Sequence, residues 1–287
     1  MKSSTSFSST LTLKGAVSKT EYWVHDLDPF LFQFSENFGI RYYGLAYALG
    51  FLAGIWLLHI FCKQGKAALT PEEQSLTITA IMLGVLLGGR LGYMFFYAFQ
   101  DMIHRPWSIF EVWKGGMASH GGFIGVVVAC WWTSKKLKMN FLQLGDILCP
   151  LVPPGIFLGR IANFINGELW GKVSNVSWAV IFPQSAPTGT PLELIVPRHP
   201  SQLYAAALEG LLLLIYSQWR FWRTGVLASP GRLTGEFLIF YSVVRIFGEQ
   251  FREPDAPLIL DLSRGSFYSL FLLAAGVFLI LRSRKTT

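Results

Sequence analysis

The stretch GRIANFINGELWG, residues 159–171, places polar side chains directly after a strongly apolar segment. It contains Arg160, Asn163, Asn166 and Glu168, although its surroundings are typical of a lipid-buried helix. An arginine at the centre of a membrane helix costs roughly 2.5–3.5 kcal/mol on the insertion scale, so such residues usually face an interior cavity or a partner. The stretch therefore predicts a polar site inside a membrane-embedded helical protein.

The composition of the whole chain supports a polytopic membrane protein. Of its 287 residues, 52% are hydrophobic and only 14% are charged, whereas a soluble domain carries about a quarter charged residues. Ten Trp, ten Tyr and 24 Phe suit the aromatic belts at membrane interfaces. We expect the net charge of +7 to set orientation and to contact membrane lipids, with no nucleic-acid partner. Cys62, Cys130 and Cys149 lack metal-ligand spacing, so we expect no disulfide framework and no metal site.

The chain contains seven apolar segments of the length that a membrane crossing needs, about 20 residues. They lie at 42–61, 76–99, 117–134, 145–167, 203–219, 235–251 and 265–281. The fourth is the weakest, because it is broken at Cys149-Pro150 and at Pro153-Pro154-Gly155.

The predicted fold class is an all-α polytopic membrane protein with seven transmembrane helices over residues 42–287. Residues 1–41 are expected to form an N-terminal tail and a surface segment. The first twenty residues are rich in Ser and Thr and lack an apolar run, so they do not read as a cleavable signal. Residues 168–202, rich in Pro, Ser, Thr and Trp, are expected to form a small periplasmic head.

The basic residues of the connections favour one orientation. The side with more of them carries Lys63, Lys66, Lys135, Lys136, Lys138, Arg220, Arg223, Arg232, Arg282, Arg284 and Lys285, and the other side carries Arg105, Lys114, Lys172, Arg198, Arg252 and Arg264. Because cytoplasmic loops carry the excess of Lys and Arg, we predict that the N-terminus lies outside and the C-terminus in the cytoplasm. Lys2, Lys14 and Lys19 in the tail oppose this bias.

Two further segments contain arginines at membrane depth. Arg90 lies in the second segment and Arg245 in the sixth, where Arg245, Glu249 and Arg252 follow at i, i+4 and i+7 on one helix stripe. Glu249 could bridge the two arginines for purely structural reasons, or it could orient a guanidinium for an incoming anion. The sequence leaves both readings open.

The polar groups of four segments are predicted to meet near the outer leaflet. Tyr43 opens the first segment and His120 the third, while Asn163 to Glu168 close the fourth and Glu249 to Arg252 close the sixth. The glycines around His120, among them Gly115 and Gly121, could admit a ligand or let helices approach closely. The common depth suggests one site. In PRHPSQLY, residues 197–204, we favour a structural reading with Ser201 as N-cap of the fifth segment.

The residue types in this site suit an anionic phospholipid. Guanidinium groups pair with phosphate in bidentate fashion, histidine accepts a proton near neutral pH, and asparagine can hold glycerol hydroxyls. The chain has no G-x-S-x-G, H-E-x-x-H or glycine-rich nucleotide loop. The residues therefore predict an enzyme or carrier of an anionic phospholipid, without naming a reaction.

The motifs supply a resemblance. GRIANFINGELWG, RYYGLAY, GGRLGY, GGMASHGG, RHPSQLY and RIFGEQFREPD occur in this order over about residues 29–281, and together they resemble the bacterial phosphatidylglycerol–prolipoprotein diacylglyceryl transferase family. The resemblance implies a multi-pass enzyme of the bacterial inner membrane, with seven spans, an outside N-terminus and an active site toward the outer leaflet. It implies transfer of the diacylglyceryl group of phosphatidylglycerol to the lipobox cysteine of prolipoprotein signal peptides, which forms a thioether and releases glycerol phosphate. No cofactor is expected. Its functional residues fall on Tyr43, His120, Arg160, Asn163, Glu168, Gly171, Arg245, Glu249 and Arg252.

We hypothesise that Arg160 and Arg245 hold the phosphate, that Asn163 holds the glycerol end, and that Glu249 orients Arg245. His120 is the candidate base that takes the proton of the thiol. Either Tyr43 assists it, or the electrostatic field of the arginines alone gives the thiol its thiolate character. Arg90, Gly115 and Gly121 are further candidates for substrate binding. The alternatives are an anionic-lipid transporter or flippase that uses the same arginines, and a scaffold held by buried ion pairs. A transporter predicts polar residues continuing to the cytoplasmic face and inverted repeats, and the sequence shows neither.

Overall fold

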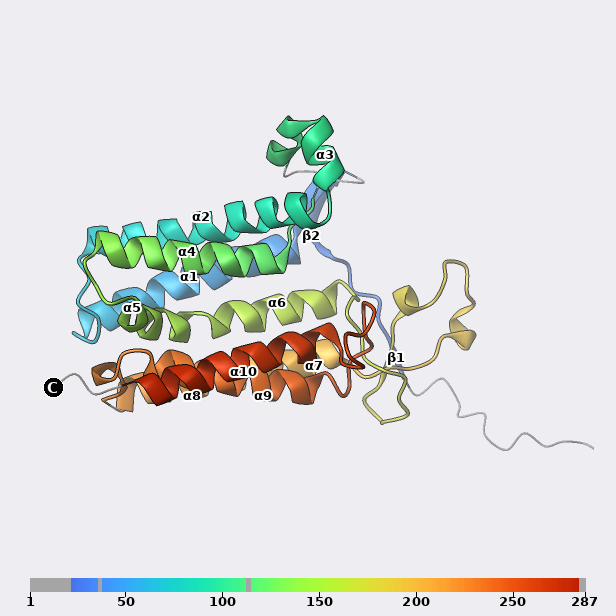
Figure 1. Ribbon diagram of the computed structural model, residues 1–287. Helices are drawn as coiled ribbons and strands as arrows, with labels where there is room; N and C mark the ends of the chain where they lie inside the picture. The colour runs from blue at the N-terminus through green and yellow to red at the C-terminus, as the bar shows by residue number, and fades with distance from the viewer. Residues whose placement is uncertain (1–21, 36–37, 112–114, 224, 284–287) are drawn as a thin grey trace, which may run out of the picture.

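The computed structural model describes residues 22–35, 38–111, 115–223 and 225–283. The predicted tail before residue 22, and the charges on Lys114, Arg284 and Lys285, lie outside these ranges. Figure 1 shows long helices that run side by side as one bundle, with a smaller irregular head at one end.

Helices make up most of the described chain. The longer ones are α1 (Tyr42–Lys63), α2 (Pro71–Phe96), α4 (Ser119–Lys136), α9 (Arg232–Gly248) and α10 (Arg264–Arg282), and the shorter ones are α3 (Phe99–His104), α5 (Phe141–Leu148), α6 (Pro153–Ile165), α7 (Ser201–Ala205) and α8 (Leu213–Arg223). Short 3₁₀ segments are η2 (Pro106–Phe110), η4 (Cys149–Leu151), η5 (Pro183–Ser185), η6 (Leu192–Leu194) and η8 (Val226–Ala228). A π-helix, η7 (Ala206–Leu212), joins α7 to α8.

Within the described ranges, three helices are long and apolar enough to cross a membrane by themselves, namely α1, α2 and α10. The pair formed by Phe141–Leu151 and Pro153–Ile165 bends by 41° and can serve as a fourth crossing. The bend falls at the predicted break, because Pro150 and Pro153 remove backbone donors there and restrict the residues before them. The chain is therefore mostly helical and carries the apolar helices of a membrane protein.

The expectation of an all-α fold is wrong in one respect, because the described chain contains two small sheets. Strands β2 (Phe30–Ser35) and β3 (Phe38–Arg41) pair antiparallel, and β1 (Trp23–Val24) pairs in parallel with β4 (Val180–Ile181). The alternation of FLFQFS in β2 has the period of a strand rather than of a helix. The parallel pair ties the start of the described chain to the head.

The predicted N-cap at Ser201 is also wrong. Helix α7 begins at Ser201 with Pro200 as its N-cap residue, and the cap makes no side-chain hydrogen bond. The Ser201 hydroxyl instead donates to the Leu169 carbonyl at 3.0 Å. This contact joins the start of α7 to the turn that follows α6, so Ser201 supports the polar region between them.

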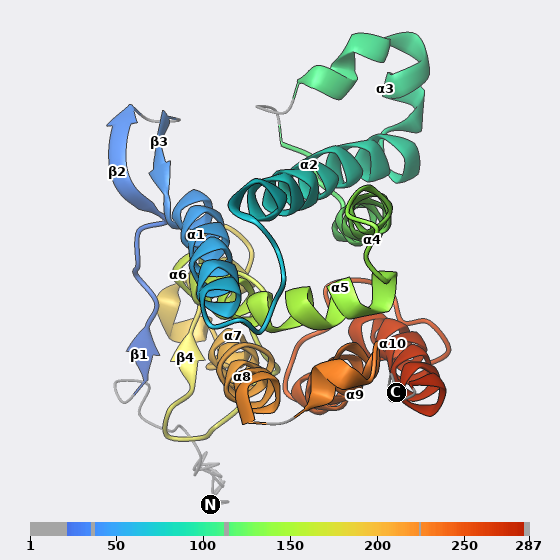
Figure 2. The ribbon, with the colours of Figure 1, turned by 90° about the vertical axis from the view of Figure 1, so that its left-hand side faces the viewer.

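Helices α2 and α4 lie side by side (Figures 1 and 2), and glycines line the contact between them. Gly84, Gly88 and Gly92 of α2 face Gly121 and Gly125 of α4, and a Cβ at Gly121 would lie 2.8 Å from the Gly92 Cα. Small residues at such positions let helix backbones approach closely in lipid. The structure therefore gives Gly121, a candidate for substrate binding, a helix-packing contact.

The half of the bundle away from the head is held by an apolar core and by polar ties. The core includes Leu58, Phe61, Leu213, Phe221 and Leu233, all nearly inaccessible. The buried Asp146 of α5 accepts hydrogen bonds from the backbone of Gly231 and Thr234 at 2.6 and 2.7 Å, which satisfies the start of α9. Glu236 pairs with Arg220 and Arg232 at the same end.

Candidate functional site

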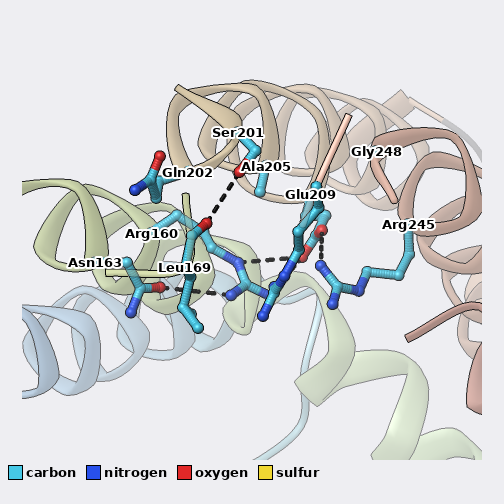
Figure 3. Close-up of a pocket in the computed structure, with 10 residues that line it drawn as sticks. Arg160, Asn163, Leu169, Ser201, Gln202, Ala205, Glu209, Arg245 and Gly248 are labelled. Carbon is cyan, nitrogen blue, oxygen red and sulfur yellow. Dashed lines mark hydrogen bonds and ion pairs between the residues drawn. The ribbon is translucent and has the colours of Figure 1, made fainter. Parts of the chain in front are cut away.

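A buried carboxylate, Glu209, lies between the two arginines predicted to bind phosphate (Figure 3). Arg160 of α6 donates from Nη2 to Glu209 Oε2 at 2.9 Å, and Arg245 of α9 donates from Nη1 to Oε1 at 3.0 Å. The Glu209 side chain is 1% exposed. Each carboxylate oxygen therefore holds one guanidinium, and three helical segments meet at this residue.

Glu249 extends the cluster toward Arg252. Its Oε1 atom lies 2.5 Å from Arg245 Nη2 and 3.9 Å from Arg252 Nε. Helix α9 ends at Gly248, so Arg252 is not on the same helix stripe as predicted but in the turn that follows. The alternation of charge is present nevertheless, and Arg252 also pairs with the exposed Asp255 at 2.9 Å.

The buried members of this cluster carry a net positive charge. Three guanidiniums, of Arg160, Arg245 and Arg252, face two carboxylates, of Glu209 and Glu249, which leaves +1. The three arginines and Glu209 line a pocket with a volume of about 10 Å³, together with Leu169 and the first turns after Pro200. Such a volume holds about one water molecule, so a phosphate group requires the pocket to open. An excess positive charge in a partly desolvated pocket favours an anion.

Asn163 connects the arginines to the start of α1. Its amide nitrogen donates to Tyr43 Oη and, at 2.8 Å, to Glu168 Oε1, while its oxygen lies 3.5 Å from Arg160 Nη1. Helix α6 ends just before Gly167, whose positive φ of 64° lets the chain reverse and return Glu168 toward Asn163. Tyr43, Asn163 and Glu168 are thus brought together, and Arg160 joins them to the ion-pair cluster.

The end of α6 and the turn after it are anchored to α7 and to the residue that follows β1. Gln202 donates to the Glu168 carbonyl at 2.6 Å. The buried His25 donates from Nε2 to the Phe164 carbonyl at 2.6 Å. These contacts fix the end of α6, which carries Asn163.

Gly171 lies where three backbone segments meet. Its N–H donates to the His199 carbonyl at 2.9 Å, it forms a bridge with Arg252, and its carbonyl accepts from Arg198 Nη1 at 3.2 Å. A Cβ at this position would lie 2.6 Å from the His199 carbonyl oxygen, so no side chain fits. Gly171 therefore brings Arg252 and His199 into position. Burial lowers the pKa of the neighbouring His199 imidazole, because desolvation disfavours its charged form.

His120 lies outside the arginine pocket. It is exposed, near the start of α4, and its ring centroid is 4.7 Å from that of Tyr268 on α10. The first turn of α10 links the two places, since Gly265 lies against Arg245 and Glu249. The structure thus places His120 beside the cluster without direct contact to it.

Arg90 lies apart from the cluster, and all its hydrogen bonds go to backbone carbonyls, while its guanidinium lies 5.8 Å from the centroid of the Tyr93 ring. Its Nε donates to Ile109, its Nη1 to Gly115 and Gly116, and its Nη2 to Ser108 and Glu111. A guanidinium has five N–H groups, and all five are used. The candidates Arg90 and Gly115 therefore build the connection between α2 and α4, and neither lines the pocket of Arg160 and Arg245.

Glu209, Ser201 and Gln202 are site residues that sequence reasoning missed. The signal for Glu209 was available, because it is an acidic residue inside the apolar segment 203–219. The rarity of charge in apolar helices that marks Arg160 and Arg245 marks Glu209 equally, and a buried guanidinium needs such a carboxylate partner. The π-helix that aims Glu209 inward has no recognisable sequence pattern.

The fold and this cluster together define a class: a helical membrane protein with a buried arginine–carboxylate site suited to an anion. Residues 29–282 match the family model of prolipoprotein diacylglyceryl transferases. Three similar relatives carry the name phosphatidylglycerol–prolipoprotein diacylglyceryl transferase. The relative from Idiomarina loihiensis is 43% identical, and the match covers 92% of this chain and 97% of the relative. The relative from Ruegeria pomeroyi is 41% identical, and the match covers 90% of this chain and 96% of the relative. The relative from Pseudoalteromonas atlantica is 41% identical, and the match covers 88% of each chain. The chain belongs to the prolipoprotein diacylglyceryl transferase family.

Proposed function

We propose that this protein transfers the diacylglyceryl group of phosphatidylglycerol to the cysteine thiol of a prolipoprotein. The family match and the names of its relatives support the reaction. The observation that carries the proposal in this chain is the set of three guanidiniums, of Arg160, Arg245 and Arg252, around the two buried carboxylates of Glu209 and Glu249, which leaves one excess positive charge. The headgroup phosphate of phosphatidylglycerol carries the single negative charge that would balance it.

In this mechanism the thiolate sulfur attacks the glycerol carbon next to the phosphate ester oxygen. The new C–S bond forms as that C–O bond breaks, the thiol proton leaves to a base, and glycerol phosphate departs. Negative charge grows on the phosphate during the step, so fixed cations stabilise the transition state more than the ground state. Arg160 and Arg245 supply these cations, and Asn163 holds the glycerol end.

Glu209 and Glu249 act as positioning residues for the arginines. A guanidinium fixed by a carboxylate keeps its planar face oriented, which matters for bidentate binding of phosphate. Arg160 uses Nε and Nη2 for Glu209, so its Nη1 side faces Asn163. The phosphate would enter on this side.

His120 is the proposed base, and Tyr43 assists it. Its ring contact with Tyr268, which lies on α10 one turn after the Gly265 that borders Arg245 and Glu249, supports a role at the edge of the site where a peptide thiol arrives. Contact with the reacting atoms requires α4 and α10 to adjust when substrates bind.

We place the protein in the bacterial inner membrane with seven spans, an outside N-terminus, and the cluster facing the outer leaflet. The excess of Lys and Arg on the opposite side supports this orientation. The division into a surface segment over residues 1–41 and a catalytic domain over 42–287, with a head at 168–202, is part of the same proposal.

The test is a reconstituted reaction. Purified protein in vesicles that contain phosphatidylglycerol is incubated with a lipobox peptide, and mass spectrometry follows the diacylglyceryl adduct. We expect an adduct that disappears when phosphatidylcholine replaces phosphatidylglycerol or when serine replaces the peptide cysteine. Absence of adduct, together with movement of labelled phosphatidylglycerol between leaflets, would support a flippase instead.

A further inference from the structure

The first turn of α10 has contacts with both the arginine cluster and His120. Helix α10 follows α9 in the chain and lies beside it (Figures 1 and 2). Its start is well defined, because the Ser263 hydroxyl accepts a hydrogen bond from the Ser266 N–H at 3.1 Å and caps the helix. A capped helical turn is a stiff unit, so the two contacts are mechanically joined.

A glycine brings this turn against the cluster. A Cβ at Gly265 would lie 2.5 Å from Glu249 Oε1 and 2.8 Å from Arg245 Nη2, so the backbone of α10 borders the ion pair directly. Farther along, a Cβ at Gly276 would lie 2.7 Å from the Gly235 carbonyl oxygen, so the backbones of α9 and α10 are close there as well. Helix α10 is therefore packed without a gap against the helix that carries Arg245.

Tyr268, three residues after Gly265, faces α4. Its ring centroid lies 4.7 Å from that of His120, with the two planes at 69°, which is the edge-to-face arrangement that aromatic pairs prefer. Within the described chain no hydrogen bond holds the imidazole of His120, which is exposed. The orientation of this imidazole therefore depends on the ring of Tyr268.

The ring contact joins two pairs of helices. Helix α4, with His120, packs against α2, while α9, with Arg245, packs against α10. The distance between the proposed base and the proposed phosphate ligands thus depends on how the two pairs meet. Tyr268 and His120 form a contact between the pairs at the end of the bundle that carries the cluster.

The same turn is in the path of any movement that opens the site. The pocket beside Arg245 has a volume of about 10 Å³ and must widen to admit a phosphate group. Since Gly265 borders Arg245 and Glu249 without a gap, their displacement pushes on the start of α10. Tyr268 lies one turn farther and moves with it.

We propose that Tyr268 is a positioning residue whose ring holds the His120 imidazole at the edge of the arginine cluster, and that the first turn of α10 transmits phosphate binding at Arg245 to it. The inference rests on the proposed function, because it takes His120 as the base. It assigns the role to the ring of Tyr268 and not to its hydroxyl. The base then reaches its working position when the lipid is bound, before the peptide thiol is deprotonated.

The kinetics of three variants test the role of the ring. Tyr268→Leu removes the aromatic edge but keeps an apolar side chain. We expect kcat to fall about fivefold at an unchanged KM for phosphatidylglycerol, the factor that the loss of one edge-to-face pair gives. Tyr268→Phe keeps the ring and should have the parent kcat. Phe271→Leu is the matched control, because it removes an exposed ring of α10 whose contact is with Phe267, and it should leave kcat unchanged.

A measurement that needs no transfer tests the transmission. The folded protein in vesicles is treated with diethylpyrocarbonate, which modifies accessible imidazoles, and mass spectrometry follows His120, with the exposed His59 as internal reference. In the parent protein and in Tyr268→Phe, we expect phosphatidylglycerol in place of phosphatidylcholine to slow modification of His120 but not of His59. In Tyr268→Leu the choice of lipid should make no difference.

The outcomes separate this proposal from the proposed function. Parent kcat in Tyr268→Leu, with transfer lost in His120→Gln, would overturn the proposal and leave the function in place. Equal modification of His120 in both lipids in the parent protein would overturn it too. So would slowing by phosphatidylglycerol that persists in Tyr268→Leu, because the lipid itself would then cover His120. A parent protein that forms no adduct would contradict the function, and the modification rates would still decide the role of Tyr268. Should Tyr268→Leu fail to fold, Tyr268→Met takes its place.

Discussion

Glu209 holds guanidiniums from two helices with its two oxygens, in a position that is almost closed to solvent. Glu209→Gln leaves both arginines without their shared charge partner. Removing one partner of a buried ion pair costs about 3 kcal/mol of stability. A shift of about 1 Å in a substrate-holding group can lower a rate by about 100-fold. We therefore expect transfer to fall by at least that factor, measured as adduct formed per minute in reconstituted vesicles.

The matched control for this prediction is Glu236→Gln. Glu236 also bridges two arginines, Arg220 and Arg232, but at the opposite end of the bundle. We expect this variant to lose stability while the remaining folded protein keeps its rate. Equal rates in the two variants would contradict a positioning role for Glu209.

The proposed base is tested by His120→Gln. A positioned general base contributes about 100-fold or more to a rate, so we expect a loss of that size and a flattened dependence of rate on pH. His59→Gln, an exposed histidine in α1, should behave like the parent protein. Near-normal transfer by His120→Gln from pH 6 to pH 9 would exclude His120 as the general base. The electrostatic field of the arginines would then account for the thiolate form of the peptide cysteine.

At the scale of residues, the sequence indicated most members of the polar site. Arg160, Asn163, Glu168 and Arg245 stand out because charged and amide groups are rare in apolar helices. The distances between these side chains could not be predicted from the sequence, because they depend on how separate helices pack. Arg90 shows why the sequence alone does not identify the arginines of the site. The hydrogen bonds of a buried arginine can all go to backbone carbonyls, and in the sequence such a residue cannot be told from an arginine that binds a ligand.

The pairing of α2 with α4 depends on glycines at their contact. A methyl group at Gly121 would meet the backbone of Gly88 and Gly92, and overpacking of this kind costs about 1–3 kcal/mol. We expect Gly121→Ala to lower the melting temperature with little change in the KM for phosphatidylglycerol. Gly44→Ala, in open space on α1, should be neutral or slightly stabilising, because alanine favours helix. A raised KM at unchanged melting temperature would instead show that Gly121 contacts substrate.

At the scale of elements, apolar runs predicted where the long helices lie, because helix formation in lipid leaves few alternatives. The broken fourth segment was predicted as well, since proline acts locally. The parallel sheet was missed because β1 and β4 are two residues each and pair across 157 positions of sequence. The two short helices between α2 and α4 were missed because α3 and η2 are too short for periodicity to detect.

The orientation of the whole molecule can be tested by cysteine labelling. In a cysteine-free background, Thr188→Cys lies on the head and Gln64→Cys lies between α1 and α2, both exposed. We expect a membrane-impermeant maleimide to label position 188 in spheroplasts, and to label position 64 only after permeabilisation. The opposite pattern would place the arginine cluster at the cytoplasmic leaflet and contradict the proposed reaction site.

The hydrogen-bonded pair β1–β4 determines whether the number of membrane crossings between its two strands is even or odd. Two strands that touch must be on the same side, so the polypeptide between Val24 and Val180 has to traverse the lipid an even number of times. Because of the bridge between Gly171 and Arg252, the chain between these two residues must also cross the membrane an even number of times. Only α10 then follows, and a single traverse by it would leave the last described residues on the face opposite the head. Two short backbone contacts thus restrict the path of the entire chain more tightly than its charge distribution does.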